Sequence, residues 1–166
     1  MNPLDWLSST LEVHVSNKAR ALGIGLPTRA FPGDAGYDLR TIMEVIVKPG
    51  KVGRFPTGLN FNLPGHDRDS ILQIPLLILP RTGLAAGKGL YPMAWVVDSG
   101  YRAEDEDGLI LALRNLGQET LNFKIGDRVA QGLFIPVWTP TLVEIPANKI
   151  DITTRSGQRL GSTGIR

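Results

Sequence analysis

The sequence predicts an all-β fold, and three features support this prediction. Nineteen Gly and twelve Pro among 166 residues interrupt the chain often, so its apolar runs stay short. Several of these runs alternate apolar with polar residues, as half-buried strands do. With 42% hydrophobic and 20% charged residues, the chain has the composition of a protein with a packed core. Its length suits a single domain.

The expected strands follow one another between turns. Residues 11–15 alternate with period two and predict the first strand, after which Pro27 and Pro32 favour an extended connection. Further strands are expected at 37–42, 45–47, 59–63, 93–97, 109–113, 128–137 and 141–145. A set of about ten short strands is typical of a β-sandwich or jelly roll.

One apolar run differs from the others because it contains a proline. Residues 70–79 form the most apolar stretch, and Pro75 lies inside it. Since proline donates no ladder hydrogen bond, we expect an edge strand, a bulge or two pieces here, and we do not expect a buried helix. The only helical turn that the sequence predicts is at 82–86.

Three regions are predicted along the chain: an N-terminal tail at 1–10, a β domain at 11–150 and a mobile C-terminal arm at 151–166. Residues 155–166 hold five Gly or Ser and little apolar content, so this end lacks the side chains to bury itself. Its basic and hydroxyl side chains suit a segment that folds over phosphate groups. A frayed tail is the alternative.

Charge and cysteine content restrict the partners that we expect. Eighteen basic and sixteen acidic residues are interspersed, and they form no basic stripe of the kind that tracks a nucleic-acid backbone. The first 21 residues contain no continuous apolar segment that would serve as a signal or a membrane span. The sequence has no Cys, which fits a reducing compartment. We therefore expect a cytoplasmic protein without a nucleic-acid or membrane partner.

Several short segments are ordinary turns when taken singly but form a series when taken together. They are GDAGYDL at 33–39, PRTGL at 80–84, VDSGYR at 97–102, GDRVAQ at 126–131 and GSTG at 161–164. In this order and spacing they resemble the five signature motifs of the dUTPase (deoxyuridine 5'-triphosphate nucleotidohydrolase) family. The lead-in LPTRA at 26–30 and the TGL at 57–59 are also typical of that family. The resemblance covers about five sixths of the chain.

The resemblance implies a specific architecture and reaction. It implies a jelly-roll (β-clip) subunit of a homotrimer, in which each active site is assembled from more than one subunit and the C-terminal arm closes over the nucleotide. The implied chemistry is attack of water on the α-phosphate of dUTP, which yields dUMP and pyrophosphate. Mg²⁺ would be the cofactor, held by the triphosphate oxygens and not by direct protein ligands.

The third motif supplies the candidate catalytic group. Asp98 follows the apolar run 93–97, where its carboxylate is placed to take a proton from an attacking water. The alternative is an Asp that only begins a turn. By the resemblance, the Tyr101 ring would lie against the deoxyribose and disfavour a 2'-hydroxyl; otherwise it packs at a hairpin edge.

The remaining motifs supply candidate phosphate contacts. Arg81, Thr82 and Gly83 offer a cation, a hydroxyl and an unobstructed backbone N–H at one turn, as an anion site requires. The resemblance assigns a phosphate contact to Gln131 and the ordering of the waters on Mg²⁺ to Asp38. In the arm, Arg155, Ser162 and Thr163 match the phosphate contacts of the family, and Leu160 stands in place of its stacking aromatic, where it can cover a face of the base.

The chain departs from the family pattern in the parts that read the base. Pro92 stands where the family commonly has Asn, and Trp95 stands where it has a Gly whose backbone lies along uracil. An indole fits a tight base slot only if the slot is reshaped or the ring points away, so Trp95 is a candidate base contact and the accepted base stays open. The arm, RSGQRLGSTG at 155–164, lacks two glycines and the stacking aromatic of the family pattern RGxGGFGSTG.

Three alternatives accompany the prediction of a dUTP hydrolase. One is a catalytically altered or inactive homologue that binds a different or modified nucleotide, or a protein partner. Another is a dCTP deaminase, which is less expected because Arg102 stands where that branch has a glutamate. The acidic run at 104–107 would be a metal site in a third reading, but such runs are more often solvated loops.

Overall fold

The computed structural model describes residues 10–64 and 71–150, and this part of the chain is mostly β-structure. The strands are β1 (Val13–Val15), β2 (Tyr37–Arg40), β3 (Val45–Val47), β4 (Val52–Pro56), β5 (Leu59–Phe61), β6 (Leu72–Gln73), β7 (Leu76–Leu79), β8 (Leu90–Pro92), β9 (Val96–Val97), β10 (Ile110–Asn115), β11 (Leu121–Phe123), β12 (Arg128–Phe134) and β13 (Val137–Trp138). The helices are α1 (Asn17–Ala21), α2 (Thr82–Lys88) and the 3-10 helix η2 (Ala147–Lys149).

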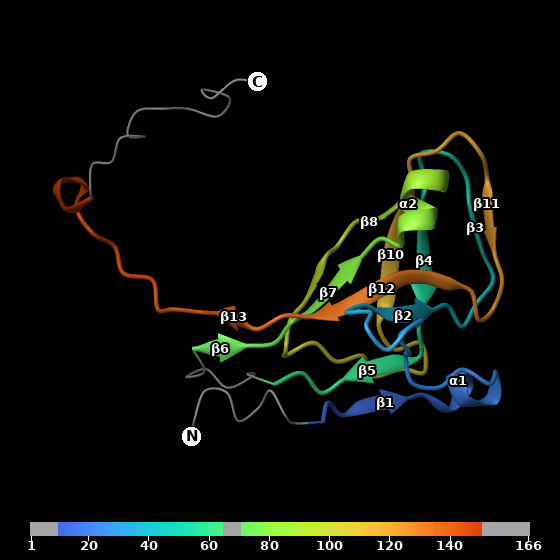
Figure 1. Cartoon of the computed structure of the whole chain (residues 1–166), viewed down its shortest axis with the longest axis horizontal. Coiled ribbons are helices and arrows are strands. Elements are labelled where there is room, and N and C mark those ends of the chain that lie inside the picture. Colours follow the sequence, from blue (N-terminus) through green and yellow to red (C-terminus); the bar gives the residue numbers. More distant parts are fainter. Residues whose placement is uncertain (1–9, 65–70, 151–166) are drawn as a thin grey trace.

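Two antiparallel sheets form the centre of the molecule. One has the strand order β2-β12-β7-β9, and the other has the order β4-β10-β8. Three further pairs, β1-β5, β11-β3 and β13-β6, are separate two-stranded sheets. Most neighbours in these sheets are distant in sequence, so the fold is held by long-range pairing (Figure 1).

The hydrophobic core is formed by side chains at alternating positions along the strands, which point inward. In β10 the buried residues are Leu111, Leu113 and Asn115, each two positions from the next. Phe55 of β4 is fully buried and meets Phe123 edge to face, with ring centroids 5.2 Å apart. Burial of one such side chain contributes about 1.5–3 kcal/mol.

Several predicted strands are confirmed. The run that contains Pro75 forms two pieces, β6 and β7, with the proline buried between them. The strand expected at 128–137 forms β12, and the chain then continues into β13. The expected strands at 37–42, 45–47, 59–63 and 109–113 correspond to β2, β3, β5 and β10.

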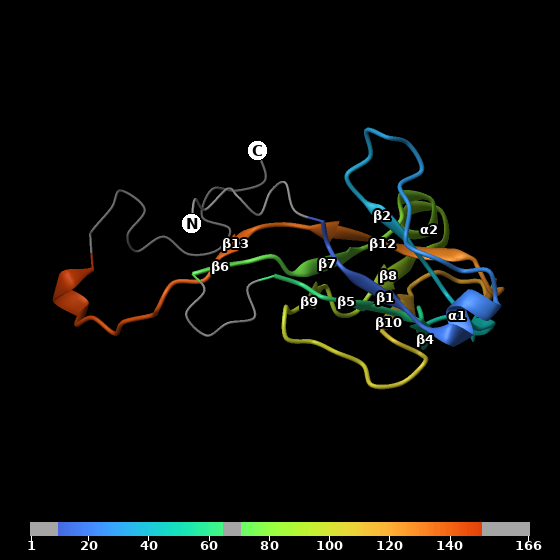
Figure 2. The same cartoon turned by 90° about the horizontal axis from the view of Figure 1, so that it is seen from below.

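Other predictions were wrong. The run 93–97 was expected to be one strand, but only Val96–Val97 pairs, and a separate strand, β8, precedes it. No strand forms at 141–145, where Leu142 is 90% exposed, because the chain there leaves the body of the molecule and meets no partner among the described residues (Figures 1 and 2). The predictions also missed β4 and β11, which span only five and three residues.

The helical prediction was right in place but incomplete. The turn expected at 82–86 is α2, which ends at Gly89 in the left-handed conformation (φ 71°). It is not the only helical segment, since α1 and η2 also occur. With only five residues, α1 is too short to show the apolar periodicity of a helix. Ser16 is its N-cap, and the Ser16 hydroxyl accepts a hydrogen bond from Ala19 N at 3.2 Å.

The two predicted terminal regions stay predictions, because residues 1–9 and 151–166 lie outside the described residues. Among residues 10–64 and 71–150, no helix has the length and apolar content that a membrane crossing requires.

Candidate functional site

The first, second and fourth motifs meet at one cavity of about 570 Å³. Strand β12 lies between β2 and β7, and its Gln131 is in register with Asp38 on one side and Leu79 on the other. This pairing places Asp38, the Arg81 turn after β7 and Gln131 side by side, although they are distant in sequence. The polar side chains that line the cavity are those of Asp34, Asp38, Arg81, Thr82 and Gln131, and Gly83 contributes backbone.

A carboxylate shared by two arginines forms one wall of this cavity. Asp38 Oδ1 accepts a hydrogen bond from Arg81 Nε, and Asp38 Oδ2 accepts one from Arg128 NH1, both at 3.0 Å. The Asp38 side chain is 12% exposed, whereas those of Arg81 and Arg128 are 29% and 41% exposed. The Asp34 carboxylate also lines the cavity, so these two arginines and two carboxylates carry no net charge. The guanidinium N–H groups that Asp38 does not use are the donors that can bind an anionic ligand.

Gln131 is held in a fixed place at the cavity. Its Nε2 donates to the Pro80 carbonyl at 3.0 Å, and this contact ties β12 to the turn before α2. A Cβ atom on Gly36 would lie 2.6 Å from Gln131 Oε1. The glycine is therefore required for the observed position of the Gln131 amide.

The N-terminal end of α2 borders the same cavity. Arg81 is the N-cap residue, and Thr82 and Gly83 are the first two residues of the helix. The first N–H groups of a helix have no intrahelical acceptor, so they are available to a ligand. Together with the Arg81 guanidinium and the Thr82 hydroxyl, they form a donor set that suits phosphate oxygens.

Asp98 and Tyr101 lie at a different cavity. They form a turn after β9, in which Tyr101 N donates to the Asp98 carbonyl at 3.0 Å. Both line a cavity of about 190 Å³ whose other walls are mainly apolar residues of β7, β9 and β10. Within one chain, therefore, the structure does not bring the Asp98 carboxylate together with Arg81 and Gln131.

The Trp95 indole folds back on its own hairpin. Its Nε1 donates to the Pro92 carbonyl at 2.9 Å, and its backbone carbonyl accepts from Ile78 N at 2.7 Å. Its neighbours Ala94 and Val96 line the cavity of Asp98, and Trp95 is not among the lining residues. In this geometry the indole points away from the cavity, one of the two arrangements that the sequence left open.

The other predicted site residues have mixed outcomes. Arg155, Leu160, Ser162 and Thr163 lie outside the described residues. The acidic run at 104–107 is anchored to α1, because Lys18 Nζ pairs with Asp107 Oδ1 at 2.7 Å and Lys18 N donates to Glu106 Oε2 at 2.9 Å. In the described part of the chain, no group of three or more acidic or His residues could hold a metal ion.

Sequence reasoning missed two arginines. Arg128 was passed over although it stands inside the fourth motif, three positions before Gln131, and a signal was therefore present. Arg102 was considered only as a replacement for a glutamate, and the sequence alone carried no sign of its contacts with other strands.

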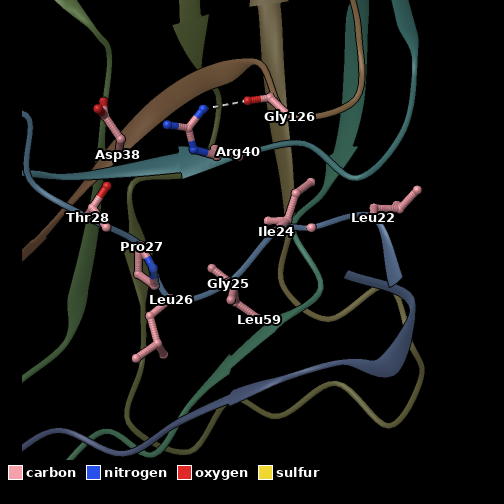
Figure 3. Close-up of a pocket in the computed structure, with 11 residues that line it drawn as sticks. Leu22, Ile24, Gly25, Leu26, Pro27, Thr28, Asp38, Arg40, Leu59 and Gly126 are labelled. Atoms are coloured by element: carbon pink, nitrogen blue, oxygen red, sulfur yellow. Dashed lines mark hydrogen bonds between the residues drawn. The ribbon is translucent and has the colours of Figure 1, made fainter. Parts of the chain in front are cut away.

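A third cavity, of about 370 Å³, lies on the other side of β2. Asp38 borders it as well as the larger cavity, and most of its wall is the segment 22–28 with Leu59. Figure 3 shows its one cation, Arg40, with the guanidinium directed at the Gly126 carbonyl, to which NH1 donates at 2.7 Å. Because Arg40 already has a partner and the walls are largely apolar, this cavity has fewer donors for a phosphate group than the cavity of Arg81 and Gln131.

Comparisons with known proteins agree with this arrangement of motifs. The sequence model of the dUTPase family matches residues 23–164. The deoxyuridine 5'-triphosphate nucleotidohydrolase of Desulfitobacterium hafniense (strain DSM 10664 / DCB-2) is 35% identical over 144 residues, which cover 84% of this chain and 87% of the bacterial protein. The protein of the same name from vaccinia virus (strain Copenhagen) is 34% identical over 156 residues, which cover 93% of this chain and 92% of the viral one.

Solved structures are similar as well. The dUTPase of Staphylococcus bacteriophage 80alpha with dUPNHPP has a TM-score of 0.78 and 20% identity, and covers 95% of this chain and 100% of its own. A variant dUTPase from phage phi11 of S. aureus, described with a structural Mg(II) ion, has a TM-score of 0.67 and 21% identity, and covers 82% of this chain and 97% of its own. At these identities the likeness shows the fold, which is the all-β jelly roll that the sequence predicts. The family model matches residues 23–164, and the two relatives are 34% and 35% identical to this chain over most of its residues. The chain therefore belongs to the dUTPase family.

Proposed function

We propose that this protein hydrolyses dUTP to dUMP and pyrophosphate. One observation carries the proposal: the register of β12 with β2 and β7 gathers Asp38, Arg81 and Gln131 around one cavity, at the N-terminal end of α2. A triphosphate is the anion that suits such a donor set, and the named activity of the two relatives is hydrolysis of dUTP.

We further propose that the active site is completed in a homotrimer. In one chain, Asp98 lines a different cavity from Arg81, so a second copy has to supply one of the two. Large apolar side chains on the segment that leaves the body support association, since Leu142 and Val143 are 90% and 77% exposed (Figure 1).

In this site Asp98 is the general base. It is exposed, and no cation pairs with it within residues 10–64 and 71–150, so its carboxylate is available to accept a proton from water. The water then attacks the α-phosphorus and pyrophosphate leaves. The Tyr101 ring lies against the deoxyribose, where it excludes a 2'-hydroxyl. The small, mainly apolar cavity beside these two residues receives the sugar and base.

The other candidate residues bind the triphosphate. Arg81, Thr82, Gly83 and Gln131 donate to its oxygens, and Asp38 holds Arg81 and Arg128 in position. From the arm, Arg155, Ser162 and Thr163 add phosphate contacts, and Leu160 covers one face of the base without offering a π surface.

The residues present fit a magnesium ion that is carried by the substrate. The described residues offer no ligand cluster, and each Asp38 oxygen already accepts one arginine. Each of these oxygens keeps a second lone pair, which suits a hydrogen bond from a metal-bound water. When bound, Mg²⁺ neutralises triphosphate charge and orients its oxygens.

Pyrophosphate release from a nucleotide panel tests the proposal. The purified protein is incubated with Mg²⁺ and each of dUTP, dCTP, dTTP, dATP and UTP. We expect release from dUTP and little from UTP, and loss of release when EDTA removes the metal. Absence of release from every nucleotide would refute the proposed activity.

A second candidate function rests on the base-reading hairpin. There the Trp95 indole donates a hydrogen bond to the Pro92 carbonyl, and both residues replace those that the family pattern has at these positions. This arrangement would suit a homologue that binds a different or modified nucleotide without hydrolysing it. Binding of a nucleotide by calorimetry, with no pyrophosphate release, would support this candidate. Deamination of dCTP is disfavoured because Arg102 is engaged with three carbonyl oxygens, and ammonia release from dCTP would overturn that view.

A further inference from the structure

Arg102 links the Asp98 turn to a neighbouring strand pair. Its NH1 donates to the carbonyl of Tyr101 at 2.7 Å and to that of Ser99 at 3.1 Å. Its NH2 donates to Asn62 Oδ1 at 2.7 Å, just beyond the end of β5. One planar guanidinium thus holds two carbonyls of the turn and one side chain of another element.

Asn62 is oriented for this contact by Glu12, the residue before β1. Its Nδ2 donates to Glu12 Oε2 at 2.8 Å, and its backbone N donates to the Glu12 carbonyl at 2.9 Å. Since the amide nitrogen faces the carboxylate, the amide oxygen faces Arg102, which has only donors to offer. Glu12, Asn62 and Arg102 therefore form a polar relay from β1 to the turn.

A second side-chain amide, that of Asn60 in β5, holds the chain directly after the turn. Asn60 Oδ1 accepts from Ala103 N at 2.9 Å. Asn60 lies in β5 and Asn62 directly follows it, so in an extended chain the two side chains point to the same side. The loop between β9 and β10, which extends from the body of the molecule, is thus attached to β5 at its beginning (Figure 2).

We propose that Arg102, oriented by Asn62 and Glu12, is a positioning residue that fixes the turn from Asp98 to Tyr101 and thereby sets kcat. The inference rests on the proposed function, in which Asp98 receives the proton. The turn itself is closed by one backbone hydrogen bond, from Tyr101 N to the Asp98 carbonyl. Arg102 adds two bonds to the same four residues, so its removal leaves Asp98 free to shift.

The expected effect is on catalysis and not on folding. Asn62 and Arg102 are exposed, and exposed polar contacts contribute little to stability. A displacement of about 1 Å in a catalytic group lowers the rate by about 100-fold. Because Arg102 directs its guanidinium at three protein oxygens, substrate binding should change far less than turnover.

The test compares four variants of the full chain. We expect Arg102→Ala to lower kcat by about 10- to 100-fold with KM within about threefold. Lysine keeps the charge but has no planar guanidinium to hold three oxygens, so the kcat of Arg102→Lys should lie between those of the wild type and Arg102→Ala. Asn62→Ala should lower kcat by about threefold to tenfold, the range of one hydrogen bond. Arg114→Ala, an exposed arginine of β10 outside the relay, is the matched control and should be unchanged.

A second measurement reports the local stability of the Asp98–Tyr101 turn independently of catalysis. Amide hydrogen exchange of residues 98–103, followed by mass spectrometry, should be faster in Arg102→Ala and Asn62→Ala than in the wild type, while the melting temperatures stay within about 2 °C. The double variant should lose no more kcat than Arg102→Ala alone, since both residues act through one contact.

These outcomes separate the relay from the proposed function. Unchanged exchange in Arg102→Ala overturns the inference whatever happens to kcat. Faster exchange with unchanged kcat also overturns it, because the position of the turn would then not matter. A wild-type protein that hydrolyses no nucleotide refutes the proposed function, and it also refutes the role of the relay in kcat. A wild-type enzyme whose Asp98→Asn variant is inactive supports the function whether or not the relay survives its own test.

Discussion

Asp38 Oδ1 and Arg81 Nε lie 3.0 Å apart, although the two residues are separated by 43 positions in the sequence. Asp38 lies in β2 and Arg81 follows β7, and neither strand pairs with the other, since β12 runs between them. The ion pair therefore crosses a strand. Arg128 of that strand completes the arrangement by pairing with the second carboxylate oxygen.

Replacing Asp38 by Asn should weaken phosphate binding. The amide retains one acceptor but loses the charge that holds Arg81 and Arg128, so we expect KM for dUTP to rise by about tenfold. The free energy of unfolding should fall by only about 1 kcal/mol, because both arginines are partly exposed. Steady-state kinetics and urea denaturation measure the two quantities. An Asp38→Asn enzyme with wild-type KM would contradict the role of this pair, and Glu44→Gln, at an exposed site, is the control.

Gly36→Ala should disturb Gln131 and leave the fold intact. The new Cβ would lie 2.6 Å from Gln131 Oε1, which is the end of a flexible side chain and can move away. The amide then leaves its place at the cavity, and we expect KM to rise by about threefold to tenfold, as for the loss of one hydrogen bond. Gly33→Ala is the matched control, since its Cβ meets nothing within 4 Å. Equal kinetics for the two variants would show that the position of Gln131 does not matter.

Asp98→Asn should abolish turnover while the nucleotide still binds. The amide cannot accept the proton of water, and loss of a general base lowers rates by about 10²- to 10⁴-fold. Binding of a non-hydrolysable dUTP analogue, measured by calorimetry, should stay within a few-fold of the wild type, since Arg81 and Gln131 are unchanged. Substantial pyrophosphate release by this variant would remove Asp98 from the mechanism.

A mixture of two inactive variants should regain activity if the site is shared between copies. Asp98→Asn lacks the base, and Arg81→Ala lacks the phosphate cation, so each homo-oligomer is impaired. After random mixing in equal amounts, roughly a quarter of all sites combine an intact Asp98 from one subunit with an intact Arg81 from another. Activity is assayed after the two proteins are unfolded and refolded together. Failure to exceed the sum of the separate activities would argue for a site within one chain.

Trp95→Gly should change nucleotide preference more than stability. Trp95 is 54% exposed, so its removal costs little burial, but it ends the contact of the indole N–H with the Pro92 carbonyl and frees the hairpin that carries Ala94 and Val96. We expect altered ratios of kcat/KM across the nucleotide panel. Trp138→Gly, at another exposed tryptophan, is the control. Identical ratios in Trp95→Gly and the wild type would exclude Trp95 from base selection.

Local sequence signals predicted the structure correctly where a residue type restricts the backbone by its own chemistry. Pro75 divides its apolar run because a proline has no N–H to donate, and the structure shows two strands there. The turn at 82–86 is a helix, and the order of the five motifs identified the family. The failures occurred where a local pattern had no neighbour to pair with, as at 141–145, or where a short strand depends on its partner, as β4 does on β10.

The amino-acid sequence by itself determined which chemical groups this protein carries and the order in which they follow along the chain. It also determined the all-β class, because glycines, prolines and period-two alternation act over a few residues. Only the tertiary structure decided that Arg128 shares Asp38 with Arg81, that the Trp95 indole turns back to Pro92, and that Arg102 reaches Asn62. The arginine contacts join residues 40 to 90 positions apart, so they depend on strand register, which no signal within one segment sets. The Trp95 contact is local, but it depends on the direction of the indole, which the sequence left open.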